Sequence, residues 1–223
     1  MWIIGDIHGC LTELKILLSK IPGDEKLLFV GDYVDRGPDS FGVIERLIIE
    51  KHRSQYLIGN HEEMMIEYLH DSVKSPHNFW LHFNNGGTET LKSYSLNEKS
   101  IFSDLPSSHQ DFFSNLKLYY ENDSFIAVHA GLRPNGDTSL EKQKREDFLW
   151  IRREWIQNES RWTGKHVYYG HTPMFMITGG KSQKEFITGK NSTGIDTGCV
   201  FGGYLSAINT DTKKIIQIQH GED

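Results

Sequence analysis

Short apolar runs and longer amphipathic stretches alternate over the first 70 residues of the chain. Residues 2–5, 27–31 and 55–58 predict buried strands, and each run leads into a glycine followed by Asp or Asn. The stretch after each run carries apolar residues on one face and predicts a helix. The polar residues that follow the glycines stand 26 and 28 residues apart, which fits successive right-handed βαβ crossovers. We therefore expect three parallel strands whose polar loops meet at one edge of a sheet.

The rest of the chain predicts further strands and a helical insertion. Apolar runs at 125–128 and 167–169 predict two more strands, and each leads into a loop that contains histidine. Residues 71 to about 118 carry aromatic residues and polar runs, and we expect short helices there that form a cap. Four tail segments alternate or run apolar and predict meandering antiparallel strands. They are 185–188, 193–196, 204–209 and 215–219.

Composition narrows the class of protein. A chain of 223 residues is long enough to bury a core, and we expect residues 1–223 to form a single domain. The net charge of −6 argues against nucleic acid as a partner, because phosphate binding needs clustered Lys and Arg. The two cysteines make no disulfide framework, and no secretory signal or membrane-spanning run is found. We expect a cytoplasmic monomer that has no membrane partner.

Polar residues with metal-binding side chains follow the predicted strands. A mixed set of oxygen and nitrogen ligands suits Mn²⁺, Fe²⁺ or Zn²⁺ better than Ca²⁺. Six ligands exceed the need of one four-coordinate ion and fit two ions, with Asp32 as the bridge because it follows the middle strand. Two such ions suit in-line displacement at phosphorus. The polar residues are Asp6, His8, Asp32, Asp35, Arg36, Asn60, His61, His129 and His171.

Three of these residues have side chains suited to other roles. Arg36 can bind phosphate oxygens with its guanidinium group. His61 follows Asn60 directly and points elsewhere, so it can protonate a leaving oxygen while Asp35 holds its other nitrogen. Simpler interpretations exist for single residues: Asp and Asn commonly cap helices after strands, and Arg36 can form a surface ion pair with Asp35.

Four motifs in order resemble the signature series of PPP-type metallophosphoesterases, which include serine/threonine protein phosphatases and calcineurin-like enzymes. They are Gly-Asp-Ile-His-Gly at 5–9, Gly-Asp-Tyr-Val-Asp-Arg-Gly at 31–37, Gly-Asn-His-Glu at 59–62 and His-Ala-Gly at 129–131. Further segments resemble the branch of the bacteriophage lambda phosphatase and its bacterial relatives, among them Gly-His-Thr-Pro at 170–173. The resemblance implies an α/β sandwich of two mixed β-sheets flanked by helices, encoded by a bacterium or a phage.

The resemblance also implies a role for each site residue. Asp6 and His8 would bind the first metal ion, and Asp32 would bridge to the second. The second ion would be bound by Asn60, His129 and His171. His61 would act as the general acid, paired with Asp35. Arg36 and Arg152 would hold the phosphate, with Arg152 chosen over Arg153 from the Trp-x-Arg pattern. The implied cofactors are two divalent ions, with Mn²⁺ favoured over Fe²⁺ and Zn²⁺.

Three hypotheses for the function follow from these motifs. The first is a phosphomonoesterase that acts on phosphorylated proteins or peptides and small phosphomonoesters, as a serine/threonine protein phosphatase that also accepts phosphotyrosine. The second is a diadenosine tetraphosphate hydrolase, which resembles the same motif series. Glu62 favours the first, because the dinucleotide branch more often carries Asp at this place. The third is a catalytically inert binding module, which the intact ligand set argues against. Asp196-Thr197-Gly198 also spells the aspartic protease triplet, which we interpret as a chance match.

Overall fold

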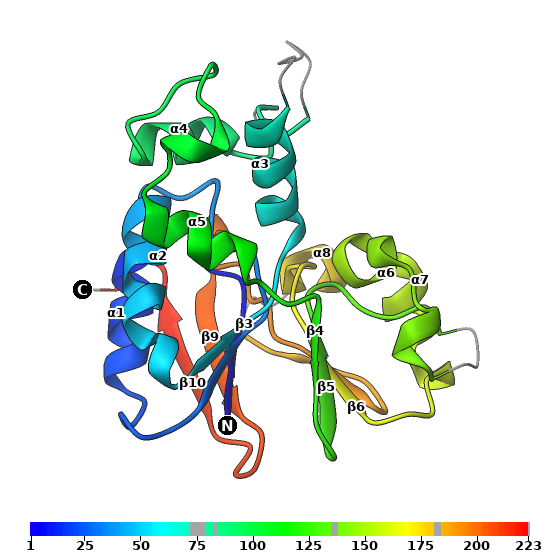
Figure 1. The fold of residues 1–223 in the computed structure, drawn as a ribbon. Coiled ribbons are helices and arrows are strands. Elements are labelled where there is room, and N and C mark those ends of the chain that lie inside the picture. The colour runs from blue at the N-terminus through cyan, green and yellow to red at the C-terminus, as the bar shows by residue number, and fades with distance from the viewer. Residues whose placement is uncertain (72–78, 83, 135–137, 181–183, 223) are drawn as a thin grey trace.

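A computed structural model describes residues 1–71, 79–82, 84–134, 138–180 and 184–222. Two five-stranded sheets stand against each other, as Figure 1 shows. The first has the order β10-β9-β1-β2-β3, and the second has the order β4-β5-β6-β8-β7. The strands are β1 (Trp2–Ile4), β2 (Leu27–Phe29), β3 (Ser54–Tyr56), β4 (Tyr119–Glu121), β5 (Phe125–Val128), β6 (His166–Tyr169), β7 (Ile187–Thr188), β8 (Ser192–Gly194), β9 (Tyr204–Asn209) and β10 (Ile215–Gln219).

The first half of the chain forms the predicted βαβ series. Strands β1, β2 and β3 are parallel neighbours, so β2 lies in the middle and the loops after all three strands share one edge. A helix follows each strand, and side-chain capping by Asp39, whose Oδ1 accepts the Gly42 N–H at 2.8 Å, starts the second one. These helices are α1 (Leu11–Ser19), α2 (Ser40–Ile49) and α3 (Asn60–His70).

The predicted meander of the tail is wrong. Strand β8 pairs in parallel with β6 in the second sheet, whereas β9 pairs antiparallel with β1 in the first sheet. Only the hairpins β7–β8 and β9–β10 are antiparallel as expected. The tail therefore completes both sheets. Alternation along a short strand shows which face is buried, but it does not identify the neighbouring strand.

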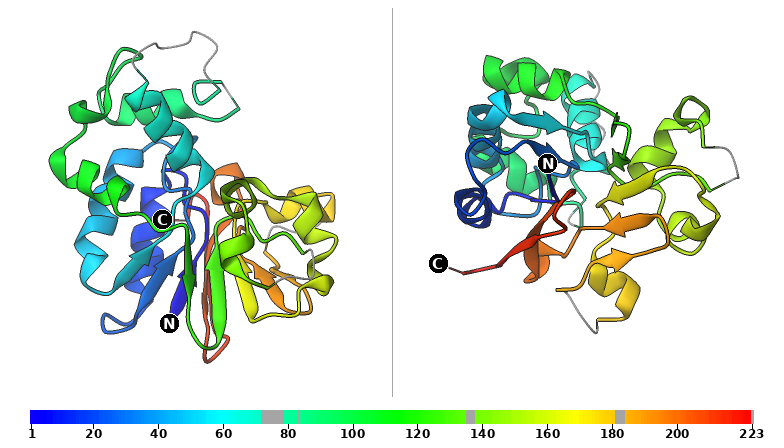
Figure 2. Two further views of the ribbon diagram at one scale, coloured as in Figure 1. Left: turned by 45° about the vertical axis from the view of Figure 1, so that its right-hand side comes forward. Right: turned by 90° about the horizontal axis from the view of Figure 1, so that it is seen from below.

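Three clusters of buried side chains hold the layers together. Residues from both sheets, among them Ile3, Leu28, Ala127 and Tyr168, pack between the sheets. A second cluster fills the space between the first sheet and helices α1, α2 and α3. The third covers the outer face of the second sheet with α6 (Arg145–Trp150) and α7 (Arg153–Ile156). Figure 2 shows these helices outside the two sheets, which confirms the predicted sandwich of two mixed β-sheets flanked by helices.

Short helices occupy the described part of the region expected to form a cap. They are α4 (Gly87–Ser93), the 3₁₀ turn Phe102–Asp104 and α5 (Ser107–Ser114). Residues 72–78 and 83 of the expected cap lie outside the described residues. Helix α8 (Met174–Thr178) follows β6 and is labelled next to α6 in Figure 1. No helix in the described ranges has the length and apolar character needed to cross a bilayer.

Candidate metal centre

The loops at the carboxyl ends of five strands bring the six predicted metal ligands together. Strands β1, β2 and β3 lead into the loops that hold the first four, and β5 and β6 lead into the other two. All six side chains are buried. They are Asp6, His8, Asp32, Asn60, His129 and His171. The predicted edge of the first sheet carries four of these residues, and loops of the second sheet add two more, so residues up to 165 positions apart meet.

Asp32 lies at the centre of this group. Its Oδ2 is 3.4 Å from Nε2 of His8, and its Oδ1 is 3.4 Å from Nε2 of His129. Two sets of potential ligand atoms, each within 4.8 Å of one another, share this carboxylate. One set adds His8 and His61, and the other adds His129 and His171. The geometry fits a dimetal site with the Asp32 carboxylate between the two ions.

In the second set, which contains Asp32, His129 and His171, atoms that carry lone pairs face one another. Nδ1 of His129 donates to the backbone carbonyl of Val30 at 2.9 Å, so Nε2 carries a lone pair. That lone pair faces Oδ1 of Asn60 at 3.0 Å and Oδ1 of Asp32 at 3.4 Å. Nδ1 of His171 lies 3.1 Å from the same nitrogen. These residues would hold a divalent cation, whose charge would offset their mutual repulsion, and the mixed donor set suits a borderline ion.

In the first set, a backbone carbonyl orients the ring of His8 as another orients the ring of His129. Nδ1 of His8 donates to the Val34 carbonyl at 2.8 Å, which leaves a lone pair on Nε2 that faces Oδ2 of Asp32. The guanidinium of Arg36 contacts this Nε2 and lies 5.4 Å from the ring centre of Phe201. The Arg36 cation therefore supplies positive charge beside His8 and Asp32.

The charges around the centre suit metal binding near neutral pH. Burial lowers the pKa of His8, His129 and His171, so each ring is neutral and can act as a ligand. Burial also raises the pKa of Asp32, but His129, His61 and His8 outweigh it and hold that pKa well below its usual range. The centre thus combines neutral rings with an ionised carboxylate, which are the protonation states that a metal ion requires.

A further buried carboxylate belongs to the centre and was missed from the sequence. Asp196 follows β8, and burial raises its pKa to about 6 although the Gly198 N–H donates to it at 2.9 Å. Burial raises the pKa of Asp6 as well, and the charges of Asp196 and Asp32 add to that rise. We interpreted this acid only as part of a protease-like triplet. The predicted strand 193–196 ends at this acid, so its place at a strand end was the signal that groups it with the other strand-end residues.

His61, a member of the first set, forms a buried pair with Asp35. Nδ1 of His61 lies 2.6 Å from Oδ2 of Asp35, and its Nε2 lies 4.0 Å from Oδ2 of Asp32. The indole N–H of Trp80 donates to both oxygens of Asp35 at 3.0 and 2.9 Å, and the Thr90 hydroxyl donates at 2.7 Å. Trp80 and Thr90 come from the expected cap region and were not predicted as site residues. This region therefore fixes the carboxylate that holds His61.

Glu62 has a structural role that the sequence did not reveal. Its Oε1 accepts the backbone N–H groups of Tyr33 and Val34 at 2.7 and 3.2 Å. Its Oε2 accepts those of Asp32 and Gly59, both at 2.9 Å. The side chain is fully buried. Glu62 thus organises the loop that carries Asp32, and its carboxylate faces backbone amides and not a substrate.

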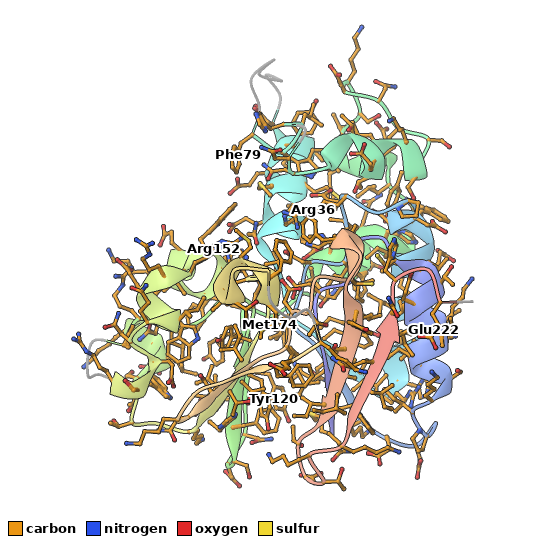
Figure 3. The ribbon with its side chains drawn as sticks, turned by 180° about the vertical axis from the view of Figure 1, so that it is seen from behind. Arg36, Phe79, Tyr120, Arg152, Met174 and Glu222 are labelled. Atoms are coloured by element: carbon orange, nitrogen blue, oxygen red, sulfur yellow. The ribbon has the colours of Figure 1, made fainter. Side chains whose placement is uncertain are left out.

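The second predicted phosphate-binding residue lies beside His171. Nη1 of Arg152 donates to the His171 carbonyl at 2.8 Å and to the Thr172 hydroxyl at 3.2 Å. Burial lowers its pKa, and the charges of Asp32, Asp196 and Asp6 oppose that effect. Arg153 is exposed on α7. Figure 3 shows Arg36 and Arg152 on one side of the molecule, with Phe79 above them. The choice of Arg152 as a phosphate ligand stays a prediction.

The backbone is strained where the candidate centre lies. Of the seven described residues other than glycine that have a positive φ, five lie at this centre, with φ between 46° and 73°. Such conformations are uncommon for residues with a Cβ and gather at functional sites. Backbone hydrogen bonds from Ile7 and His8 to the Asp32 carbonyl, at 3.0 and 2.9 Å, lock the first two loops together. The five residues are His8, Asp32, Asp35, Arg36 and His171.

Solved structures share the fold. A putative diadenosine tetraphosphatase superimposes with a TM-score of 0.70 at 23% identity, covering 100% of this chain and 94% of the other. A metallophosphoesterase from Sphaerobacter thermophilus gives a TM-score of 0.60 at 16% identity, with 100% and 89% covered. A cold-active protein tyrosine phosphatase gives 0.56 at 15% identity, with 100% and 76% covered.

Sequence relatives are similar over almost the whole chain. The asymmetrical bis(5'-nucleosyl)-tetraphosphatase PrpE of Bacillus thuringiensis is 31% identical over 251 residues, with 97% of this chain and 92% of the relative covered. The protein of the same name from Anoxybacillus flavithermus is 28% identical over 248 residues, with the same coverage. These names favour the dinucleotide hypothesis over the protein phosphatase hypothesis, against the direction in which Glu62 was taken to point.

The family itself is shown by a direct match. The model of the family described as calcineurin-like phosphoesterase matches residues 1–203, which include all six predicted metal ligands. Members of this family use divalent metal ions, and the two ligand sets around Asp32 fit that use. The chain belongs to the calcineurin-like phosphoesterase family.

Proposed function

We propose that this protein is a metal-dependent hydrolase of bis(5'-nucleosyl) tetraphosphates that cuts the phosphate chain off-centre. The observation that carries the proposal is the similarity, over 97% of this chain, to relatives named asymmetrical bis(5'-nucleosyl)-tetraphosphatases. A cut in the middle of a tetraphosphate gives two equal diphosphates. An asymmetrical cut gives one nucleoside monophosphate and one nucleoside triphosphate.

In this proposal, the residues of the candidate centre hold two divalent ions at the phosphate chain of the substrate. Asp6, His8 and Asp32 would hold one divalent ion, and Asp32 with Asn60, His129 and His171 would hold the other. When bound, the two ions supply positive charge for the phosphoryl oxygens and acidify a water molecule that attacks phosphorus. The side chains around them bind and orient the substrate.

Proton transfer and phosphate binding fall to the remaining residues. His61 would donate the proton that the leaving phosphate oxygen takes up, and Asp35 at 2.6 Å would stabilise the charged ring before that transfer. Arg36 and Arg152 would bind phosphate oxygens on the two sides of the centre. Hydrolysis of the phosphate chain consumes one water molecule and releases a nucleoside monophosphate and a nucleoside triphosphate.

A substrate comparison tests the proposal. One Mn²⁺-loaded preparation is given diadenosine tetraphosphate and a phosphoserine peptide, and kcat/KM is compared. The expected result is a preference for the dinucleotide of at least about a hundredfold, with AMP and ATP as products, which corresponds to about 2.7 kcal/mol in transition-state binding. Asp32→Asn prepared in parallel reports any contaminating activity. A preference for the peptide would overturn the proposal, and so would a symmetrical cut that gives ADP as the only product.

A further inference from the structure

A surface cavity opens next to the candidate centre, between helices α7 and α8. Its volume is about 440 Å³, which is within the range of small-molecule sites. Residues of α7 and the residue on each side of it form one wall, and Thr172, Met176 and Ile177, before and within α8, form the other. The lining residues are Arg152, Arg153, Ile156, Gln157, Thr172, Met176 and Ile177.

Arg152 connects the cavity to the centre. It lines the cavity, and its Nη1 donates to the carbonyl of His171, a predicted metal ligand, at 2.8 Å. The same nitrogen donates to the hydroxyl of Thr172, which also lines the cavity. A phosphate group held by the Arg152 guanidinium would therefore lie between the metal centre and the cavity mouth.

The rest of the lining suits a nucleobase. Ile156, Met176 and Ile177 offer aliphatic surface on both walls, and Met176 is 61% exposed although its side chain is large and apolar. Methionine is flexible and polarisable, and it packs well against aromatic rings. The amide of Gln157 carries both donors and an acceptor for the edge of a base. Apolar walls with a few polar groups are the usual composition of a ligand pocket.

We propose that this cavity binds the nucleoside next to the scissile phosphate, and that its closeness to the metal centre sets the off-centre cut. The inference rests on the proposed function. Because Arg152 contacts His171 and also lines the cavity, a nucleoside seated there would place its nearest phosphates at the candidate metal centre. The phosphates further along the chain, and the second nucleoside, extend away from the cavity. The reaction then releases one nucleoside monophosphate and one nucleoside triphosphate.

The first test truncates the exposed wall residue. Met176→Ser is compared with Ile49→Ser. Ile49 is the last residue of α2, and its apolar side chain is 62% exposed, close to the exposure of Met176. Met176→Ser should raise KM for diadenosine tetraphosphate about fivefold, since part of one apolar side chain is lost from the contact. Turnover of p-nitrophenyl phosphate, which has no nucleoside, should change less than twofold. Ile49→Ser should alter neither substrate.

The second test measures nucleoside binding without using the dinucleotide. AMP and ribose 5-phosphate carry the same phosphate and sugar, and only AMP carries a base. AMP should inhibit hydrolysis of p-nitrophenyl phosphate at least about tenfold more strongly than ribose 5-phosphate does, because it also buries the base. Met176→Ser should reduce the ratio between the inhibition constants of ribose 5-phosphate and AMP about fivefold. Equal inhibition by the two compounds in the native protein would overturn the inference.

The two proposals fail in distinguishable ways. One outcome is that the native protein hydrolyses diadenosine tetraphosphate to AMP and ATP while Met176→Ser leaves both KM and the ratio of the two inhibition constants unchanged. In that case the cavity inference is wrong and the proposed function stands. If the native protein turns over p-nitrophenyl phosphate but leaves the dinucleotide intact, the proposed function fails and the cavity inference falls with it.

Discussion

Nδ1 of His61 lies 2.6 Å from Oδ2 of Asp35, and both groups are buried beside Asp32. A histidine held in this way by a carboxylate can carry a proton that it then gives to a leaving group. We expect His61→Asn to lower kcat by about a hundredfold to ten-thousandfold while the metal content stays at the native level. Kinetics with elemental analysis of the same sample checks this. A collapse of the metal content would show that His61 is a ligand, so that its predicted role is wrong.

The contact between Trp80 and Asp35 gives a prediction about a residue of the expected cap. Trp80→Phe keeps an aromatic ring but removes the N–H that donates to both oxygens of Asp35. A hydrogen bond to a charged group contributes about 1.5–3 kcal/mol, so we expect a loss of roughly tenfold in kcat with little change in KM. The matched control is Trp162→Phe, which removes a bond to the Lys165 carbonyl far from the centre. Equal kcat values for the two variants would contradict the prediction.

Glu62 gives a prediction about stability and not about substrate choice. Glu62→Gln places an amide nitrogen against backbone N–H groups, so buried donors of the Asp32 loop lose their acceptor. We expect a fall of about 3 kcal/mol in the free energy of unfolding. The ratio of kcat/KM for dinucleotide and peptide should stay constant. Denaturant unfolding and both assays measure this, with Glu67→Gln on the same helix as the control. A changed substrate ratio would return Glu62 to its predicted role in specificity.

Metal removal should destabilise the protein, because lone pairs of Asn60, Asp32 and His129 face one another in the centre. A ligand that binds only the folded state stabilises it by about 2.7 kcal/mol at a hundred times its dissociation constant. Thermal unfolding after dialysis against a chelator should show a lower Tm, and Mn²⁺ should restore it. Asp32→Ala should show no gain with Mn²⁺. A native Tm that is the same with and without the ion would contradict the dimetal interpretation.

The sequence predicted the position of the centre because strand-end loops share an edge wherever neighbouring strands are parallel. The 26- and 28-residue spacing and the glycines before Asp6, Asp32 and Asn60 were sufficient for that step. The same logic extends to Asp196 after β8, but we expected an antiparallel strand there and did not apply it. The pairing of β8 with β6 depends on long-range contacts that local alternation does not contain.

Residues that support the centre were harder to predict than residues that form it. Trp80 and Thr90 reach Asp35 from 45 and 55 positions further along the chain, out of a region with no clear periodicity. Glu62 was visible in its motif, but the direction of its carboxylate depends on the Asp32 loop. The single-domain organisation, the monomeric state and the preference for Mn²⁺ stay predictions.

The ligand set that spans both sheets has a consequence for synthesis of the protein. Asp6, His8, Asp32 and Asn60 lie in the first 60 residues, whereas His129 and His171 come from the second sheet. A growing chain therefore exposes half-formed ligand sets long before the second site can close. Loading of both predicted ion sites would wait until residue 171 has left the ribosome and the second sheet has docked. Two ions bound by these residues would then link loops of both sheets that were made at different times.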